Sequence, residues 1–466
     1  MIVETTLGAV RGHALPGGGE VFAGIPFAAP PIGELRFRPP QPPAPWSGVR
    51  DGGRFAAAPA QGSPTLVGET KWPALPGFPT GDLGPTAEDC LYLNVWVPGG
   101  DGPRPVIVWI YGGGFESGSA APPYTDGAAL ARQTGAVVVA ANYRLGALGF
   151  LHLPSIGAVN LGVQDQVAAL RWVRDNIGGF GGDPDNITVA GQSAGAYSVG
   201  TLLAVPAASG LFHKAILQSG NASRSFSPAT AAGMADDFLA ALGISSADDL
   251  RTVAVDQILA AQRTVIDGDV GRRNLPGGRA WGAVVDGSVL PVFPHQAVVA
   301  GAAAAVPLLI GATADEVRLF QVLNGDRFRP ADEAALLAEI ALTGASDPLA
   351  LLETYRADDL SAARSAFLTD TIYRLPAVQL AEAQLAAGGR AFHYLFRDEP
   401  LGPTLGAFHG ADLLYTFDAL ALVGADTPDR LAVQDALVQA FATFAATGDP
   451  GWAAPAREFG GVSSKI

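Results

Sequence analysis

The stretch Ile187-Thr-Val-Ala-Gly-Gln-Ser193-Ala-Gly195 is the part of the sequence from which the fold can be predicted. Its first four residues are apolar or β-branched and predict a buried strand, and the residues after Gly195 are compatible with a helix. Ser193 therefore lies in a G-x-S-x-G sequence between a strand and a helix, where the two glycines leave room for a tight turn. Alone, the pentapeptide is a weak signal, because an ordinary strand-to-helix turn can carry the same residues.

The same order of elements recurs on the N-terminal side of this stretch. An apolar run, Val106–Ile110, is followed by Gly112–Gly114, and a second, Val137–Tyr143, ends near Gly146. Continuous apolar strands of this kind are typical of a sheet that is covered on both faces. Between the strands, Asp165–Ile177 has apolar residues at helical spacing. Alternating strands and helices predict an α/β fold with a mostly parallel central sheet and helices on both faces.

The second half of the chain carries more helical than strand signals. Residues 225–305 and 321–389 contain Ala- and Leu-rich segments, which we interpret as helical insertions over the sheet. A late helix is predicted over about Pro428–Thr447, because Leu437, Phe441 and Phe444 fall on one helical face and the segment stops at Gly448. The sequence has no fixed-period repeat and no obvious linker, so we expect one domain over residues 1–466.

Composition excludes several classes of function. The 466 residues carry a net charge of −15, with 29 basic against 44 acidic side chains. Nucleic acids and anionic membranes need clustered basic residues, so neither is an expected partner. The N-terminal segment lacks the basic and apolar regions of a signal peptide, and the longest uncharged stretch, 297–314, is broken by glycine and proline. Cys90 is the single cysteine, so no internal disulfide can form, and we expect a soluble cytoplasmic protein.

A serine attacks a carbonyl group when a base takes its proton and a carboxylate holds that base. His409 follows a Gly- and Pro-rich loop late in the chain, where the order serine, acid, histidine would place the base. The remaining histidines lie in apolar runs or turn-like segments without a motif: His13, His152, His213, His295 and His393. Glu316 directly follows the predicted strand Val306–Ile310, so it would face the usual site of an open α/β sheet. Asp315 fits the same spacing, and either acid could instead be solvated in a loop.

The attacked carbonyl becomes an oxyanion, which needs hydrogen-bond donors. The glycines that follow Val106–Ile110 have the layout in which backbone N–H groups point into such a site, with Tyr111 where a histidine is usual. We therefore expect the N–H groups of Gly113 and Gly114 to act together with that of Ala194. A structural glycine turn is the alternative interpretation.

Two longer stretches are far more specific than the pentapeptide: Glu88-Asp-Cys-Leu-Tyr-Leu-Asn-Val95 and Phe180-Gly-Gly-Asp-Pro-Asp-Asn-Ile-Thr-Val-Ala-Gly-Gln-Ser193-Ala-Gly195. They resemble the two signatures of the type-B carboxylesterase family, which includes para-nitrobenzyl esterases, liver-type carboxylesterases and cholinesterases. Further matches are Gly24–Gly33 with Leu35–Phe37, Trp109–Phe115, Asn142–Gly146 and Ala169–Ile177. The resemblance runs from about residue 2 to the C-terminus.

The resemblance implies an α/β-hydrolase fold and a serine esterase that hydrolyses carboxylic esters through an acyl-enzyme. It implies a catalytic triad of Ser193, Glu316 and His409. The family places the acid in an Asp-Glu-Gly step, which favours Glu316 over Asp315, although Val317 here replaces the glycine.

The same resemblance implies further roles around the triad. Gly113, Gly114 and Ala194 would form the oxyanion hole. Phe115, beside the oxyanion glycines, and Phe320, four residues after the acid, would bind substrate.

The expected substrates are small-molecule esters with short to medium acyl or aryl groups, such as p-nitrophenyl or p-nitrobenzyl esters. We expect no metal and no organic cofactor, because the sequence has no zinc, phosphate or dinucleotide motif, and a monomer is favoured. Carbamates, aryl amides and polyester-like diesters are alternative substrates for the same triad. A remote alternative is a non-catalytic binding protein on this fold.

Departures from the family pattern bear on the substrate. Gln192 stands where most relatives have a glutamate, so a negative charge beside the site is lost. The cysteine expected near Pro59 is missing, which leaves Cys90 free and disfavours the cholinesterase-type site for quaternary ammonium groups. Asp412 replaces a common glutamate and shortens a buried polar link. The chain also stops at Ile466, where relatives continue, so a shortened C-terminus is expected.

Overall fold

The computed structural model describes residues 1–62, 84–100, 102–121, 126–357, 359–452 and 456–461. The expectation of a shortened C-terminus lies outside these residues. In the described part of the chain, a ten-stranded sheet has the strand order β15-β14-β13-β12-β11-β9-β10-β8-β4-β3. Its seven strands from β15 to β10 run parallel, and β8, β4 and β3 are joined antiparallel. The expected mostly parallel sheet is confirmed.

The strands of this sheet are β3 (His13–Ala14), β4 (Glu20–Pro26), β8 (Tyr92–Val97), β9 (Arg104–Ile110), β10 (Val137–Ala141), β11 (Gly182–Gln192), β12 (Lys214–Gln218), β13 (Leu308–Thr313), β14 (Ala391–Phe396) and β15 (Ala456–Phe459). Two small sheets join β1 (Ile2–Thr5), β2 (Gly8–Arg11) and β5 (Val49–Asp51), and β6 (Ala58–Pro59) and β7 (Thr86–Ala87).

The helices are α1 (Gly127–Thr134), α2 (Gly146–Phe150), α3 (Leu161–Asn176), α4 (Ala194–Leu202), α5 (Pro228–Leu242), α6 (Val255–Thr264), α7 (Val270–Arg273), α8 (Pro294–Val299), α9 (Arg318–Asn324), α10 (Glu333–Ala341), α11 (Pro348–Thr354), α12 (Leu360–Leu368), α13 (Leu375–Ala386), α14 (Ala411–Thr416) and α15 (Pro428–Thr447). A π-helical turn, η7 (Thr369–Arg374), joins α12 to α13. The helices cover the sheet in two groups. One group, α1, α14 and α15, forms a connected layer, while α3, α4, α8 and α13 form another.

Local sequence explains the elements at the centre of the molecule. All five residues of β10 are buried, as are the last five of β9, so β-branched and aromatic side chains fill both faces of these strands. The helix α15 has the predicted bounds, because Thr427 caps its first turn and Gly448 ends it with a φ of 76°. In contrast, α3 begins at Leu161, four residues before the expected start.

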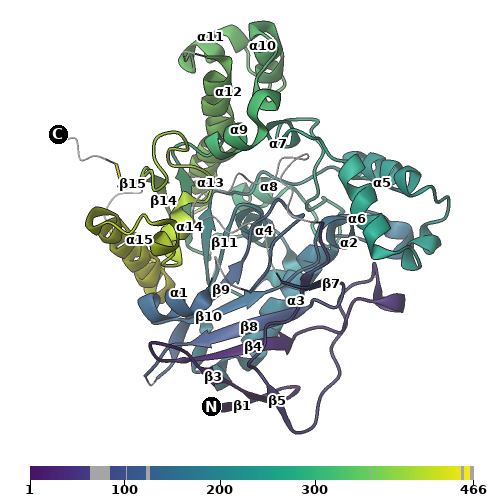
Figure 1. Ribbon diagram of the computed structural model, residues 1–466, viewed down its shortest axis with the longest axis vertical. Helices are drawn as coiled ribbons and strands as arrows, with labels where there is room; N and C mark the ends of the chain where they lie inside the picture. Colours follow the sequence, from purple (N-terminus) through teal and green to yellow (C-terminus); the bar gives the residue numbers. More distant parts are fainter. Residues whose placement is uncertain (63–83, 101, 122–125, 358, 453–455, 462–466) are drawn as a thin grey trace.

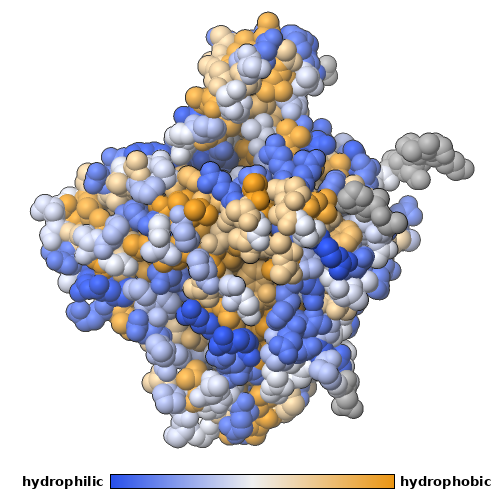
Figure 2. All heavy atoms as spheres, turned by 180° about the vertical axis from the view of Figure 1, so that it is seen from behind, coloured by the Kyte–Doolittle hydropathy of each residue, from blue (hydrophilic) through white to orange (hydrophobic). Residues whose placement is uncertain are grey.

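The two regions expected to be helical insertions contain α5 to α8 and α10 to α13, and the second also includes the end of α9. The helices α10, α11 and α12 project from the sheet region at the top of Figure 1. Apolar residues appear on this projection in Figure 2, and the exposed ones include Leu342 and Leu349. The division into one catalytic domain with two insertions stays a prediction.

Candidate active site

Ser193 lies at the turn where β11 ends and α4 begins. Its φ is 55° and its ψ is −124°, a conformation that residues other than glycine rarely adopt. The two flanking glycines make this turn possible: a Cβ on Gly195 would lie 1.9 Å from the carbonyl oxygen of Ile110, and one on Gly191 would lie 2.5 Å from the Gly195 carbonyl carbon. The Ser193 amide donates to Gln218 O at 2.9 Å, which ties the turn to β12. Backbone strain held by close packing is a feature of functional turns.

Glu316 and His409, far apart in the sequence, meet near the carboxyl ends of the strands. The distance from His409 Nδ1 to Glu316 Oε2 is 2.6 Å, and the Glu316 carboxylate is completely buried. The amide of Thr313, the last residue of β13, donates to Glu316 Oε1 at 2.8 Å. A buried carboxylate that accepts from Nδ1–H fixes the imidazole orientation and leaves Nε2 free to accept a proton.

The Nε2 atom of His409 faces the amide of Gln192, and the Nε2 atoms of the two side chains are 3.2 Å apart. In the tautomer whose Nδ1–H donates to Glu316, the Gln192 amide donates to His409 Nε2. Between Ser193 and His409, both of which the structure describes, no hydrogen bond is formed. The Ser193 hydroxyl would therefore have to replace the Gln192 amide at Nε2 to give up its proton, as catalytic hydrogen bonds often tighten when substrate binds.

Asp315, the rival acid, has a different environment. It pairs with Arg318 at 3.1 Å, and its Oδ2 accepts from the Ala407 amide at 3.1 Å. Its side chain is a quarter exposed, whereas Glu316 is buried. Asp315 thus holds the loop that carries His409, and of the two acids only Glu316 contacts the imidazole.

The glycine loop after β9 lies directly beside Ser193. A Cβ on Gly112 would be 3.0 Å from Ser193 Cβ. The φ values of Gly113 and Gly114 are 113° and 66°, and a Cβ on Gly113 would clash with Ser117 O at 2.1 Å. The loop carbonyl of Gly113 accepts from the amides of residues 116 and 117. Among the described residues, no protein acceptor is bound to the N–H groups of Gly113, Gly114 and Ala194.

Aromatic rings surround the imidazole. The ring centroid of Phe320 lies 5.3 Å from that of His409, and that of Tyr373 lies 5.0 Å away on η7. Sequence reasoning named Phe320 and missed Tyr373, because nothing in its helical neighbourhood marks a contact with a residue 36 positions later. π-Helical turns are often found at functional sites. The other expected wall, Phe115, is buried and packs edge-on against Phe150 at 4.8 Å.

Asp412 forms a second buried carboxylate close to the site. Its Oδ2 accepts from Gln218 Nε2 at 2.9 Å and from the Tyr394 hydroxyl at 3.0 Å. Burial raises the pKa of Asp412 to about 6, and the nearby Glu316 carboxylate acts in the same direction, against the two hydrogen bonds. Asp412 therefore titrates near neutral pH beneath the His409 loop.

The remaining histidines lie outside this cluster. His393 is in β14, as expected for a strand residue, whereas His13 lies in β3 and His295 in α8 rather than in turns. Among the described residues, no group of three or more His, Cys, Asp or Glu side chains could bind a metal ion. In that same part of the chain, every helix is too short or too polar to cross a membrane.

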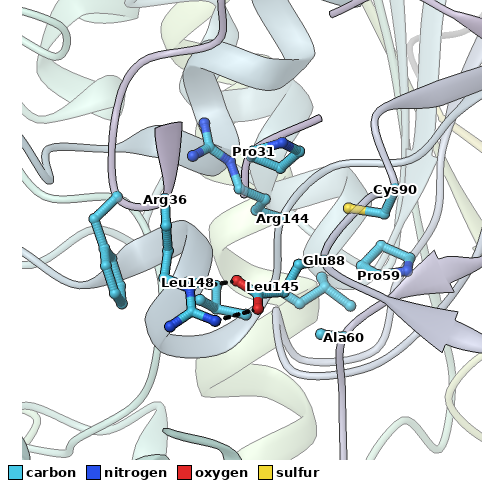
Figure 3. A pocket seen from close by; sticks show the side chains of 10 residues that line it. Pro31, Arg36, Pro59, Ala60, Glu88, Cys90, Arg144, Leu145 and Leu148 are labelled. Carbon is cyan, nitrogen blue, oxygen red and sulfur yellow. Dashed lines mark hydrogen bonds and ion pairs between the residues drawn. The ribbon is translucent and has the colours of Figure 1, made fainter. Parts of the chain in front are cut away.

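Cys90 is a buried free thiol in a small pocket at a different place in the structure. Figure 3 shows it beside Pro59, and Arg36 binds Glu88 in the same pocket through a hydrogen-bonded ion pair. Burial raises the pKa of the Cys90 thiol well above its usual value, so the thiol stays protonated and unreactive.

The fold and the buried His–Glu pair beside a strained serine define a serine hydrolase of the α/β-hydrolase type. Residues 1–459 match the family model described as the carboxylesterase family, and the chain belongs to this family. The para-nitrobenzyl esterase of Bacillus subtilis (strain 168) is 37% identical over 463 residues, which cover 96% of this chain and 90% of that protein. The fumonisin B1 esterase of Sphingopyxis macrogoltabida is 42% identical over 335 residues, 69% of this chain and 57% of that protein.

Solved structures agree with the family assignment. The carboxylesterase of Geobacillus stearothermophilus superposes with a TM-score of 0.84 at 38% identity, covering 97% of this chain and 92% of its own. The α/β-hydrolase fold and the expectation of a carboxylic ester hydrolase are thereby confirmed.

Proposed function

We propose that Ser193, Glu316 and His409 form the catalytic triad of this carboxylesterase, with an oxyanion hole of Gly113, Gly114 and Ala194. The observation that carries the proposal is the 2.6 Å contact between His409 Nδ1 and the buried Glu316 carboxylate, on loops that converge on the strained turn of Ser193.

In the proposed reaction, His409 Nε2 takes the hydroxyl proton while Ser193 Oγ bonds to the ester carbonyl carbon. The carbonyl oxygen becomes an oxyanion that accepts from the three backbone N–H groups. The imidazolium then protonates the departing alcohol as the carbon–oxygen bond breaks, which leaves an acyl-enzyme. A water molecule gives a proton to His409 and bonds to the acyl carbon; the bond from that carbon to Ser193 Oγ then breaks as the imidazolium returns the proton to Oγ, which releases the acid and free Ser193. Glu316 keeps the imidazole oriented and stabilises its positive charge in both steps.

The proposed substrates are esters with short to medium acyl or aryl groups, including p-nitrobenzyl esters. The likeness to the para-nitrobenzyl esterase of Bacillus subtilis and the apolar ring of Phe115 support this class. A reducing, cytoplasmic location is also proposed, because the single cysteine is a buried thiol. The monomeric state stays a prediction.

The test is a p-nitrophenyl ester series of increasing acyl length, assayed on the wild-type protein and on Ser193→Ala. We expect Ser193→Ala to lower kcat by about 10³- to 10⁶-fold on every ester, because the residual rate comes from the oxyanion hole alone. The matched control is Ser209→Ala, an exposed serine in the turn after α4, which should keep its rate within about twofold. Equal rates in Ser193→Ala and the wild type would contradict the proposal.

A further inference from the structure

Arg224 places a guanidinium group next to the candidate active site. It lies between β12 and α5, and its Cζ atom is 5.4 Å from the ring centroid of Phe115 and 5.5 Å from that of Tyr197. Phe115 directly follows the oxyanion glycines, and Tyr197 lies one helical turn after Ser193 on α4. The guanidinium is therefore bracketed by the two elements that would hold the reacting carbonyl.

A third ring connects Arg224 to the imidazole. Tyr373 interacts electrostatically with Arg224, and its ring is 5.0 Å from that of His409. Arg224 thus lies close to the oxyanion loop, to α4 and to the ring that covers the base. No family signature in the sequence pointed to it.

Charge around Arg224 is not balanced by the protein. The nearby carboxylate of Glu116 is already bound to Arg273 Nη1 at 2.9 Å. Burial raises the pKa of Glu116, and its arginine neighbours act in the opposite direction. In the part of the chain that the structure describes, Arg224 Nε is buried and has no hydrogen-bond partner.

A buried guanidinium donor without an acceptor costs free energy, and the planar fork of arginine fits a carboxylate through two parallel hydrogen bonds. Phe115 packs against Phe150, which also lines a small, mostly apolar pocket together with Phe226 and Trp281. A ligand with an apolar chain and a carboxylate matches both features. We assign the substituent beside Phe115 to the acyl chain, and an ester pair that carries the acid on the alcohol part tests this assignment.

We propose that Arg224 binds an ionised carboxylate on the acyl part of the substrate, so that the enzyme prefers hemi-esters of dicarboxylic acids. The inference rests on the proposed function and specifies its substrate class. The alcohol leaves as in any ester hydrolysis, and the second carboxylate takes no part in bond breaking.

The test compares two para-nitrobenzyl esters of the same length at neutral pH: the hemi-ester of glutaric acid, and its neutral isostere, the glutaramate ester. The measured quantity is the ratio of kcat/KM for the hemi-ester to kcat/KM for the amide, from the release of para-nitrobenzyl alcohol. A second pair carries the carboxylate or the amide on the alcohol part of an acetate ester.

We expect the wild type to prefer the hemi-ester, and Arg224→Met to lower the ratio by about 10- to 100-fold, the value of a charge-assisted hydrogen bond. Arg224→Lys should keep part of the preference. The matched control is Arg457→Met, because Arg457 also lies over two aromatic rings, Trp452 and Phe459, but on the edge strand β15. Its ratio should equal that of the wild type.

A second variant covers the case in which Arg224→Met does not fold, judged by thermal unfolding and by fluorophosphonate labelling. Glu116→Gln removes the competing carboxylate, so it should raise the ratio by about two- to fivefold. Three outcomes would overturn the inference. The wild type could prefer the amide, or the ratio could be unchanged in both Arg224→Met and Glu116→Gln. The variants could also change the ratio only for the ester pair that carries the acid on its alcohol part. If wild type hydrolyses neither ester, the proposed function itself fails; if it hydrolyses both without preference, only this inference does.

Discussion

Two regions of the molecule bury charged groups, and they treat them differently. In the Arg144 region, Asp165 accepts from Arg144 Nε at 2.8 Å and Nη2 at 2.7 Å, and Arg144 Nη1 donates to Arg38 O at 2.8 Å. In the Ser193 region, the same kinds of group keep unused capacity: Asp412 Oδ1 and Arg224 Nε are buried without a partner among the described residues.

The difference distinguishes buried polar groups that stabilise the fold from those that can bind a ligand. A saturated ion pair stabilises one arrangement of the chain and leaves nothing for a ligand to bind. A buried donor or acceptor without a partner lowers the stability of the free protein. A substrate that supplies the missing partner removes this cost when it binds. The comparison predicts that changes in the Arg144 region reduce stability, whereas changes in the Ser193 region reduce activity.

The largest expected effect tests the acid of the Ser193 region. Glu316→Gln keeps the size of the side chain but removes the charge that orients the imidazole, so kcat should fall by about 10²- to 10⁴-fold. Ester hydrolysis and thermal unfolding are measured on the same preparation. Asp315→Asn is the matched control, because Asp315 binds Arg318 and the Ala407 amide instead of the imidazole. A larger loss in Asp315→Asn than in Glu316→Gln would exchange the two assignments.

The next effect is on stability. Arg144→Met leaves the Asp165 carboxylate buried and unpaired, so the free energy of unfolding should fall by about 3–5 kcal/mol in denaturant titrations. The exposed pair of Arg174 and Asp175 provides the control, and Arg174→Met should change the free energy of unfolding by less than about 1 kcal/mol. Equal losses in the two variants would remove the distinction between the regions.

Asp412 gives a pH dependence with a definite sign. Its pKa is raised in the folded protein to about 6, so the folded state holds the proton more tightly than the unfolded chain. The stability that Asp412 contributes by holding this proton is fully present below the unfolded pKa of about 4, and it is lost as the pH rises through about 6. We expect the free energy of unfolding of Asp412→Asn minus that of wild type to rise by about 1–3 kcal/mol from pH 4 to pH 7. Parallel stability curves for the two proteins would contradict the prediction.

The smallest effect concerns the amide beside the base. Gln192→Glu places a negative charge near His409 Nε2, which stabilises the imidazolium and keeps the base protonated to higher pH. The pH of half-maximal activity on the acidic side should therefore rise by about half a unit to one unit. Gln439→Glu, an exposed position on α15, should leave the profile in place. A shift to lower pH in Gln192→Glu would show that the charge acts elsewhere.

Much of the fold could be read from periodicity and glycine placement. The strand–glycine–helix order predicted β9, β10, β11 and α4, and the apolar face together with the stop at Gly448 predicted α15. Expected bounds shifted by a few residues where tertiary packing extends an element, as at the start of α3. The candidates Ser193, Glu316 and His409 came from spacing and family resemblance, and their roles stay a proposal.

Other features of the site have no local signal. Tyr373 lies near the imidazole, and Arg224 lies near Phe115, only because η7 and the segment after β12 are brought to the site by the tertiary fold. The contact between Gln192 and His409 likewise joins residues 217 positions apart.

The sequence by itself determined the family, the alternation of strands and helices along the chain, and the tight turn at Ser193, because periodicity and glycine requirements act within a few residues of one another. Only the tertiary structure decided which acid touches His409, which donors remain unpaired and which charges are saturated. Those properties depend on burial and on distances between segments remote in the chain, and a hydrogen bond forms or fails over a few tenths of an ångström that no sequence spacing fixes.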